Sequence, residues 1–68
     1  MSIDAEEATL KALVFLRKVG HQYLIALGAE LKGNYWLITF QSMNIRLTVN
    51  VNKFNGKIIG YKPTEKQK

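Results

Sequence analysis

The stretch NIRLTVNVN, residues 44–52, alternates apolar and polar side chains almost without a break. In an extended chain, successive side chains point to opposite sides, so the apolar residues share one face: Ile45, Leu47, Val49 and Val51. Such an alternation predicts a strand of an antiparallel sheet that is covered on one side and wet on the other. We expect this strand over residues 45–53.

The residues before it follow the same period. In YWLITFQ, residues 35–41, Trp36, Ile38 and Phe40 alternate with Tyr35, Leu37 and Thr39. The next connection, QSMN, would set Phe40 opposite Ile45, Ile38 opposite Leu47 and Trp36 opposite Val49. This register keeps all of these apolar side chains on one face.

The segment YLIALGAELK, residues 23–32, has a composition that suits a helix as well as a strand. A two-residue turn at Gly33-Asn34 decides between them by register. It would pair Leu31 with Trp36, Ala29 with Ile38 and Leu27 with Phe40. The segment is therefore predicted to be a strand.

The segment NKFNGK, residues 52–57, carries the hairpin signal Asn55-Gly56. A two-residue turn would set Val51 against Gly60 and would turn Ile59 and Tyr61 toward the polar face, so the apolar side chains of the two strands would not match. A three-residue loop over 54–56, with Gly56 left-handed, gives these pairs: Lys53–Lys57, Val51–Ile59 and Val49–Tyr61. It predicts a strand over 57–62 that places Ile58 and Gly60 on the polar face, and a frayed tail over 63–68.

The N-terminal third predicts a helix over residues 4–19. Asp4 and Glu7 have the spacing of a capping box, with Ser2 as a competing cap, and Gly20 can end the helix. Apolar residues recur at helical spacing: Ala5, Ala8, Ala12, Leu13, Leu16 and Val19. The chain thus reads as a single α+β domain over residues 1–68, with one N-terminal helix packed on one face of a four-stranded antiparallel meander.

The net charge of +5 is distributed unevenly. Residues 1–33 carry as many acidic as basic side chains, whereas residues 34–68 carry six of the 10 basic side chains and one of the five acidic ones. A basic excess of this kind favours nucleic acid, an anionic surface or an acidic protein as partner, or it serves solubility alone.

Few residues are suited to catalysis. His21 is the only histidine, and it follows the glycine that ends the helix. Ser42 is better explained as a turn residue than as a nucleophile, since no base and acid accompany it. Without cysteine or a glycine-rich phosphate motif, the sequence predicts no enzyme, no cofactor and no metal site.

The cellular location is predicted from sequence features that the chain lacks. The acidic N-terminus is unlike a secretory signal, and no apolar run reaches the roughly 20 residues of a membrane span. Together with the lack of cysteine, these features lead us to expect a cytoplasmic protein.

Two stretches resemble the PepSY domain. NYWLITF is similar to the aromatic strand Y-x-V-x-V of that family, and VNKFNGKI, residues 51–58, is similar to V-D-A-x-T-G-x-V. Val51, Gly56 and Ile58 fit the second pattern directly, while Asn52, Lys53 and Asn55 stand where Asp, Ala and Thr are usual. The resemblance covers residues 20–61 and implies a helix followed by antiparallel strands. It also implies a function in binding or restraining a partner, with no catalytic residues.

The candidate binding site is the polar face of the sheet with the lysines near it. Trp36 and Phe40 are assigned to the core, because they fall on the helix-covered face. The candidate residues are Lys32, Tyr35, Thr39, Arg46, Thr48, Asn50, Lys53, Lys57 and Lys62. We expect a small non-enzymatic binding or regulatory module that acts through a protein partner or a homo-oligomer. The alternative is a nucleic-acid-binding protein that uses this face, and a third possibility is an assembly subunit without a ligand.

Overall fold

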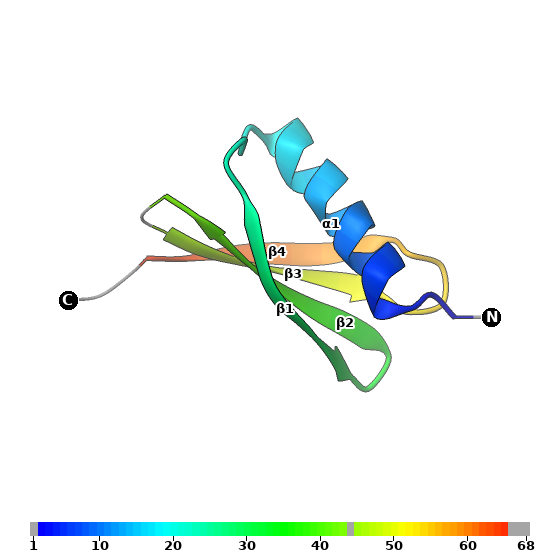
Figure 1. Ribbon diagram of the computed structural model, residues 1–68. Helices are drawn as coiled ribbons and strands as arrows, with labels where there is room; N and C mark the ends of the chain where they lie inside the picture. The colour runs from blue at the N-terminus through cyan, green and yellow to red at the C-terminus, as the bar shows by residue number, and fades with distance from the viewer. Residues whose placement is uncertain (1, 44, 66–68) are drawn as a thin grey trace.

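The computed structural model describes residues 2–43 and 45–65 and confirms the predicted α+β architecture. A single helix lies across one face of an antiparallel sheet in which the strands follow one another in chain order, β1-β2-β3-β4 (Figure 1). The elements are α1 (Ala5–Val19), β1 (Ile25–Lys32), β2 (Tyr35–Ser42), β3 (Ile45–Asn52) and β4 (Ile58–Glu65).

Local signals set both ends of α1. The side chain of Asp4 accepts a hydrogen bond of 2.9 Å from the backbone N–H of Glu7, as an N-cap residue does. At the other end Gly20 has a φ of 125°, and its N–H donates to the carbonyl of Leu16 at 3.1 Å. The backbone N–H of His21 donates to the same carbonyl at 3.0 Å. The predicted helix over 4–19 is therefore confirmed, with residue 4 as the cap.

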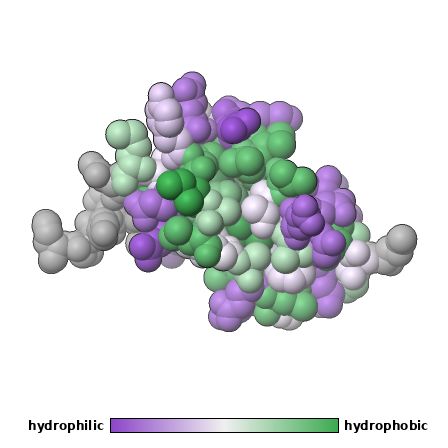
Figure 2. All heavy atoms as spheres, in the orientation of Figure 1, coloured by the Kyte–Doolittle hydropathy of each residue, from purple (hydrophilic) through white to green (hydrophobic). Residues whose placement is uncertain are grey.

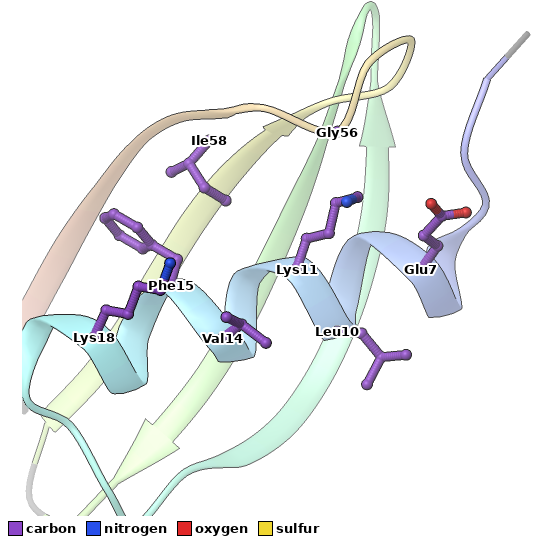
Figure 3. Close-up of a pocket in the computed structure, with 8 residues that line it drawn as sticks. All are labelled: Glu7, Leu10, Lys11, Val14, Phe15, Lys18, Gly56 and Ile58. Atoms are coloured by element: carbon purple, nitrogen blue, oxygen red, sulfur yellow. The ribbon is translucent and has the colours of Figure 1, made fainter.

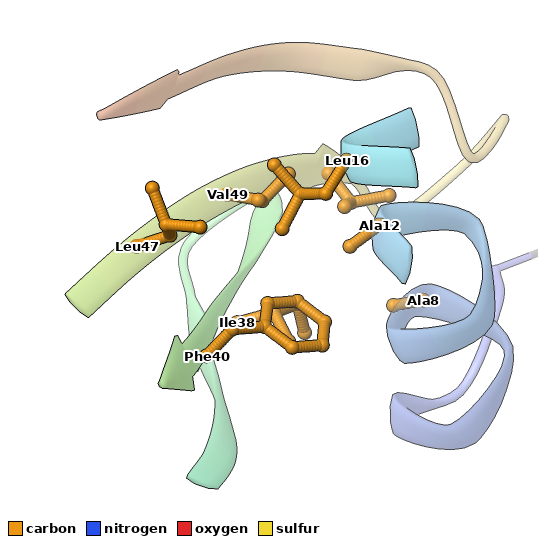
Figure 4. Close-up of a cluster of buried hydrophobic side chains, with 8 residues drawn as sticks. Ala8, Ala12, Leu16, Ile38, Phe40, Leu47 and Val49 are labelled. Atoms are coloured by element: carbon orange, nitrogen blue, oxygen red, sulfur yellow. The ribbon is translucent and has the colours of Figure 1, made fainter. Parts of the chain in front are cut away.

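The core lies between α1 and the two central strands. Figure 4 shows the helix residues directed at the apolar side chains of β2 and β3. The buried residues are Ala8, Ala12, Leu16, Ile38, Phe40, Leu47, Val49 and Val51. Two of the three helical members are alanines, whose small side chains let the helix approach the sheet closely. Trp36 packs against this core from its edge, as expected.

The register of β1 on β2 agrees with the prediction near the turn and departs from it further on. Gly33 has a φ of 63° in the two-residue turn, and the pairs next to it are Lys32–Tyr35, Leu31–Trp36 and Ala29–Ile38. The predicted pair of Leu27 with Phe40 is wrong, because a bulge between Ala26 and Gly28 brings Ala26 opposite Phe40. The bulge inserts one residue, so strict alternation along β1 is lost there.

The predicted register of β2 on β3 is wrong by two residues. Ser42 pairs with Ile45, so that Phe40 lies opposite Leu47. The turn is tighter than expected because Met43 takes a φ of 53°, and the Gln41 side chain donates to the Met43 carbonyl at 3.0 Å. A shift by two residues leaves every side chain on its predicted face. Ser42 is consequently a buried strand residue and not part of the turn.

The hairpin between β3 and β4 has a longer loop than predicted. Asn52 pairs with Lys57 through a backbone hydrogen bond of 2.8 Å, which leaves Lys53–Gly56 as the loop. The Asn52 side chain accepts the N–H of Phe54 at 2.7 Å, so the chain turns one residue earlier than expected. Lys53 therefore does not face Lys57. Gly56 has the expected positive φ, 75°, whereas Asn55 does not, which excludes the two-residue alternative.

A second bulge restores the predicted register along β4. Val51 pairs with Ile58 in place of Ile59, whereas Val49 pairs with Tyr61 as predicted. Ile58 thus packs against the core, and its predicted place on the polar face is wrong.

The predicted strand boundaries also need correction. β1 begins at Ile25 and not at 23, and β3 ends at Asn52 and not at 53. β2 extends to Ser42, one residue past the predicted end, and β4 begins at Ile58 and not at 57. The chain stays paired beyond Pro63 to Glu65, so the predicted tail is wrong for residues 63–65, and residues 66–68 lie outside the described part. A proline is tolerated there because β4 is an edge strand.

Candidate binding surfaces

The open face of the sheet, opposite α1, gathers most of the predicted site residues. Cross-strand pairing places Lys32 beside Tyr35, and Thr48 lies between Thr39 and Lys62. Arg46 and Asn50 lie on the same face of β3 as Thr48, since they are two residues away on either side. Seven of the nine candidates therefore share one surface: Lys32, Tyr35, Thr39, Arg46, Thr48, Asn50 and Lys62.

The remaining two candidates lie outside that face. Lys53 is in the β3–β4 loop, where its Nζ lies 5.2 Å from the centre of the Phe54 ring. Its backbone is held on both sides, because its N–H donates to the Asn34 carbonyl at 3.1 Å and its carbonyl accepts from Ile3 at 2.7 Å. Lys57 follows the same loop and is exposed. These lysines belong to one end of the sheet and not to the open face.

A shallow depression lies on the open face between β2, β3 and β4. It is lined by Tyr35, Leu37, Thr48, Asn50, Ile59, Gly60, Tyr61 and Lys62. The hydroxyl of Thr48 donates to the Lys62 carbonyl at 3.3 Å across its wall. The bulge at Ile59 adds an apolar side chain that is 57% exposed. Sequence reasoning missed Ile59, because the bulge reverses the side to which alternation assigns it.

A groove on the helix side was also missed by sequence reasoning. It lies between α1 and the β3–β4 loop, with apolar walls from Leu10, Val14, Phe15 and Ile58 (Figure 3). The stem of Lys11 lies over Gly56, and Lys18 and Glu7 line the same groove. The signal in the sequence was the width of the apolar stripe of the helix, which exceeds what one buried face requires.

The outer strand β1 is the most exposed apolar element. Every residue from Ile25 to Lys32 is exposed, and the large side chains are 65% (Ile25), 50% (Leu27) and 48% (Leu31) exposed. In Figure 2, where β1 is turned toward the viewer, green apolar surface crosses the middle of the molecule with hydrophilic residues around it. Next to Ile25, at the start of β1, the exposed side chains of Tyr23 and Met43 extend this apolar surface around a second hollow.

Charged side chains on β1 neutralise one another. Lys32 Nζ lies 3.7 Å from Glu30 Oε2, and both side chains are exposed. It is the one ion pair among the side chains of residues 2–43 and 45–63. Because β1 has no other charged residue, its outer edge carries no net charge.

Groups that could bind a metal stay apart in the described part of the chain. In residues 2–43 and 45–63, no three His, Cys, Asp or Glu side chains are close enough to one another to hold a metal ion. His21 is half-buried at the end of α1, where its backbone belongs to the helix cap.

Within the described residues, no helix has the length and apolarity to cross a membrane. The chain matches no known protein-family model, no curated protein and no solved structure at a significant level.

Proposed function

We propose that this chain is a small non-enzymatic binding module, PepSY-like in character, that docks a protein on the outer edge of its sheet. The observation that carries the proposal is the exposure of β1 along its whole length. Its three large apolar side chains are between 48% and 65% exposed. An apolar edge strand is a template for another strand, because its outer backbone N–H and C=O groups have no partner in the sheet.

The resemblance to PepSY domains agrees with this role. It implies a module that binds or restrains a partner, and the order of one helix followed by antiparallel strands is compatible with it. The large apolar side chains of β1 would also gain free energy from being covered. Full burial of a leucine or isoleucine side chain is worth about 1.5–3 kcal/mol.

Site-specific photo-crosslinking in the cells that naturally contain the protein tests the proposal. A photoreactive amino acid at Ile25 or Leu27 is expected to capture protein, because both side chains lie on β1 and are exposed. The matched control is the same amino acid at Ile59, an equally exposed position on the other edge. Adducts at Ile59 alone, or at none of these positions, would contradict docking on β1.

Nucleic-acid binding is the second candidate, favoured by one observation. Lys32, Arg46 and Lys62 share the open face with the ring of Tyr35. Lysine and arginine contacts to phosphate release counterions, so affinity for single-stranded RNA or DNA should fall steeply with salt. Because Tyr35 is the one aromatic ring among these candidates, stacking would add little.

Fluorescence anisotropy with a labelled oligonucleotide, measured between about 50 and 300 mM salt, tests this candidate. Replacing Lys32, Arg46 and Lys62 by Gln should abolish binding, whereas replacing Lys11 and Lys18 on the helix should leave it unchanged. Equal loss in both triple and double variants would indicate nonspecific attraction, which counts against a site on the open face.

A further inference from the structure

We propose that the protein docked on β1 is a second copy of this chain, paired antiparallel through β1 so that two sheets join into one. This inference rests on the proposed docking at β1 and adds the identity of the partner. A strand can always pair antiparallel with its own copy about a twofold axis, and the resulting interface closes on itself.

The distribution of charge is compatible with this arrangement. Each chain has a net charge of +5, so two copies repel unless their basic parts stay apart. Among the described basic residues of 34–68, Arg46 lies on β3 and Lys62 on β4, two and three strands away from β1. At a spacing of about 4.8 Å between strands, that is roughly 10 and 14 Å from β1. The Debye length at physiological salt is about 8 Å, so this repulsion is largely screened.

The edge of β1 itself brings no charge conflict. Glu30 and Lys32 are its only charged residues, and they already pair with each other. β4 likewise carries one basic and one acidic residue, Lys62 and Glu65, and Lys57 directly precedes it. The charges of β1 therefore permit contact between two copies at this edge.

The two edges also differ in how they admit another strand. β4 contains Pro63, which has no N–H to donate, and a lysine immediately before it. Prolines, lysines and bulges are devices that prevent pairing at sheet edges. β1 has a bulge between Ala26 and Gly28, but from Gly28 to Lys32 its register is regular. Five consecutive residues of β1 are thus available for a symmetric pairing that covers Leu31.

Sedimentation equilibrium of the full chain at about 150 mM salt is the first test. We expect a species of twice the 7.8 kDa chain mass. Leu31→Lys should weaken this dimer at least tenfold, since it places a charge of each copy at the seam. The control is Ile59→Lys, the same kind of change at an exposed position near the other edge, which should leave the dimer unaffected. Circular dichroism checks that both variants fold.

Single-cysteine variants locate the seam, because the chain has no cysteine of its own. A disulfide needs Cα atoms within about 4.4–6.8 Å, so in a twofold pairing only residues near the axis can form one. Oxidation of Gly28→Cys, Ala29→Cys and Leu31→Cys should give a sharp maximum at one position, and Ile59→Cys should give none. A maximum at Ile59, or equal yields at all four positions, would overturn the inference.

Failure of this inference can be told from failure of the proposed function. A monomer at all concentrations whose β1 crosslinks to a different protein overturns the second copy and leaves the docking surface standing. A monomer without any crosslink at β1 overturns both. A dimer that responds to Leu31→Lys and gives an adduct of twice the chain mass supports both.

Discussion

The two outer strands of the sheet have the same length and each carries one bulge, yet they differ in how their side chains are packed and in how open their outer edges are to another strand. β4 is held against the helix, since Tyr61 packs edge-on against Phe15 with ring centres 5.3 Å apart, and its outer edge carries Lys62 and Pro63. β1 has small residues where it faces the helix, Ala26 and Ala29, and all of its side chains remain exposed. One edge is closed to further strands by its own residues, and the other is left apolar and neutral. The difference indicates that β1 is the edge available to a partner.

The largest expected effect tests the core that both edges share. Leu16 is fully buried between α1 and the sheet. Leu16→Ala should lower the free energy of unfolding by about 2–4 kcal/mol, because it removes buried methyl groups and leaves a cavity. Leu10→Ala on the exposed side of α1 should change it by less than about 0.5 kcal/mol. Urea denaturation measures both; equal losses would place the helix differently from Figure 4.

The next effect concerns the loop that begins the closed edge. Gly56 has a φ of 75°, and a Cβ there would lie 2.6 Å from Cδ of Lys11. Gly56→Ala should therefore destabilise the chain by about 1 kcal/mol or more. Asn55→Ala should cost less, since it removes one exposed hydrogen bond of 2.9 Å to the Lys57 N–H.

A double variant separates the two causes at Gly56. Adding Lys11→Ala should recover the part of the loss that comes from the close contact but not the part that comes from φ. Full recovery in a thermal melt would show that the backbone conformation at Gly56 is not strained for alanine.

A smaller effect measures how firmly β4 is attached to the helix. The Phe15–Tyr61 pair is edge-to-face, a geometry worth about 0.5–1.5 kcal/mol beyond the area it buries. A double-mutant cycle with Phe15→Leu and Tyr61→Leu should give a coupling energy in this range. The same cycle between Phe15 and Leu31 on β1 should give none. Coupling of equal size at both edges would remove the contrast between them.

The smallest effect sharpens the claim that β1 is neutral. Glu30→Gln removes one partner of an exposed ion pair and should change the stability of each chain by less than about 0.5 kcal/mol. It also leaves one uncompensated positive charge on each β1. The proposed dimer should then weaken at about 20 mM salt and recover at about 500 mM, where charges are screened. Weakening that is independent of salt would contradict an electrostatic origin.

The register errors show how far alternation can be used. The β2–β3 register was wrong by two residues, and every side chain still fell on its predicted face, because the period of a strand is two. The two bulges, at Leu27 and Ile59, shift the pattern by one residue and so reverse a face. That is why Ile58 was placed on the open face although it packs against the core. A bulge depends on how neighbouring strands fit together, and the glycine that follows each of them, Gly28 and Gly60, is only a weak signal for it.

The elements of this protein, their order and the fully buried apolar residues of its core can be predicted from the sequence. Caps such as Asp4 and Gly20, the helical spacing of the buried residues and the alternation along β3 act within a few residues, so they can be read from the chain. Which strand is left uncovered depends instead on the tertiary structure. The hydrophobic pattern requires β1 to have a buried face as much as its neighbours, but a single helix with a 15-residue span covers only part of a four-stranded sheet. The position of the helix over β2 and β3 follows from packing across the whole core, and it is this position that exposes Leu27 and Leu31.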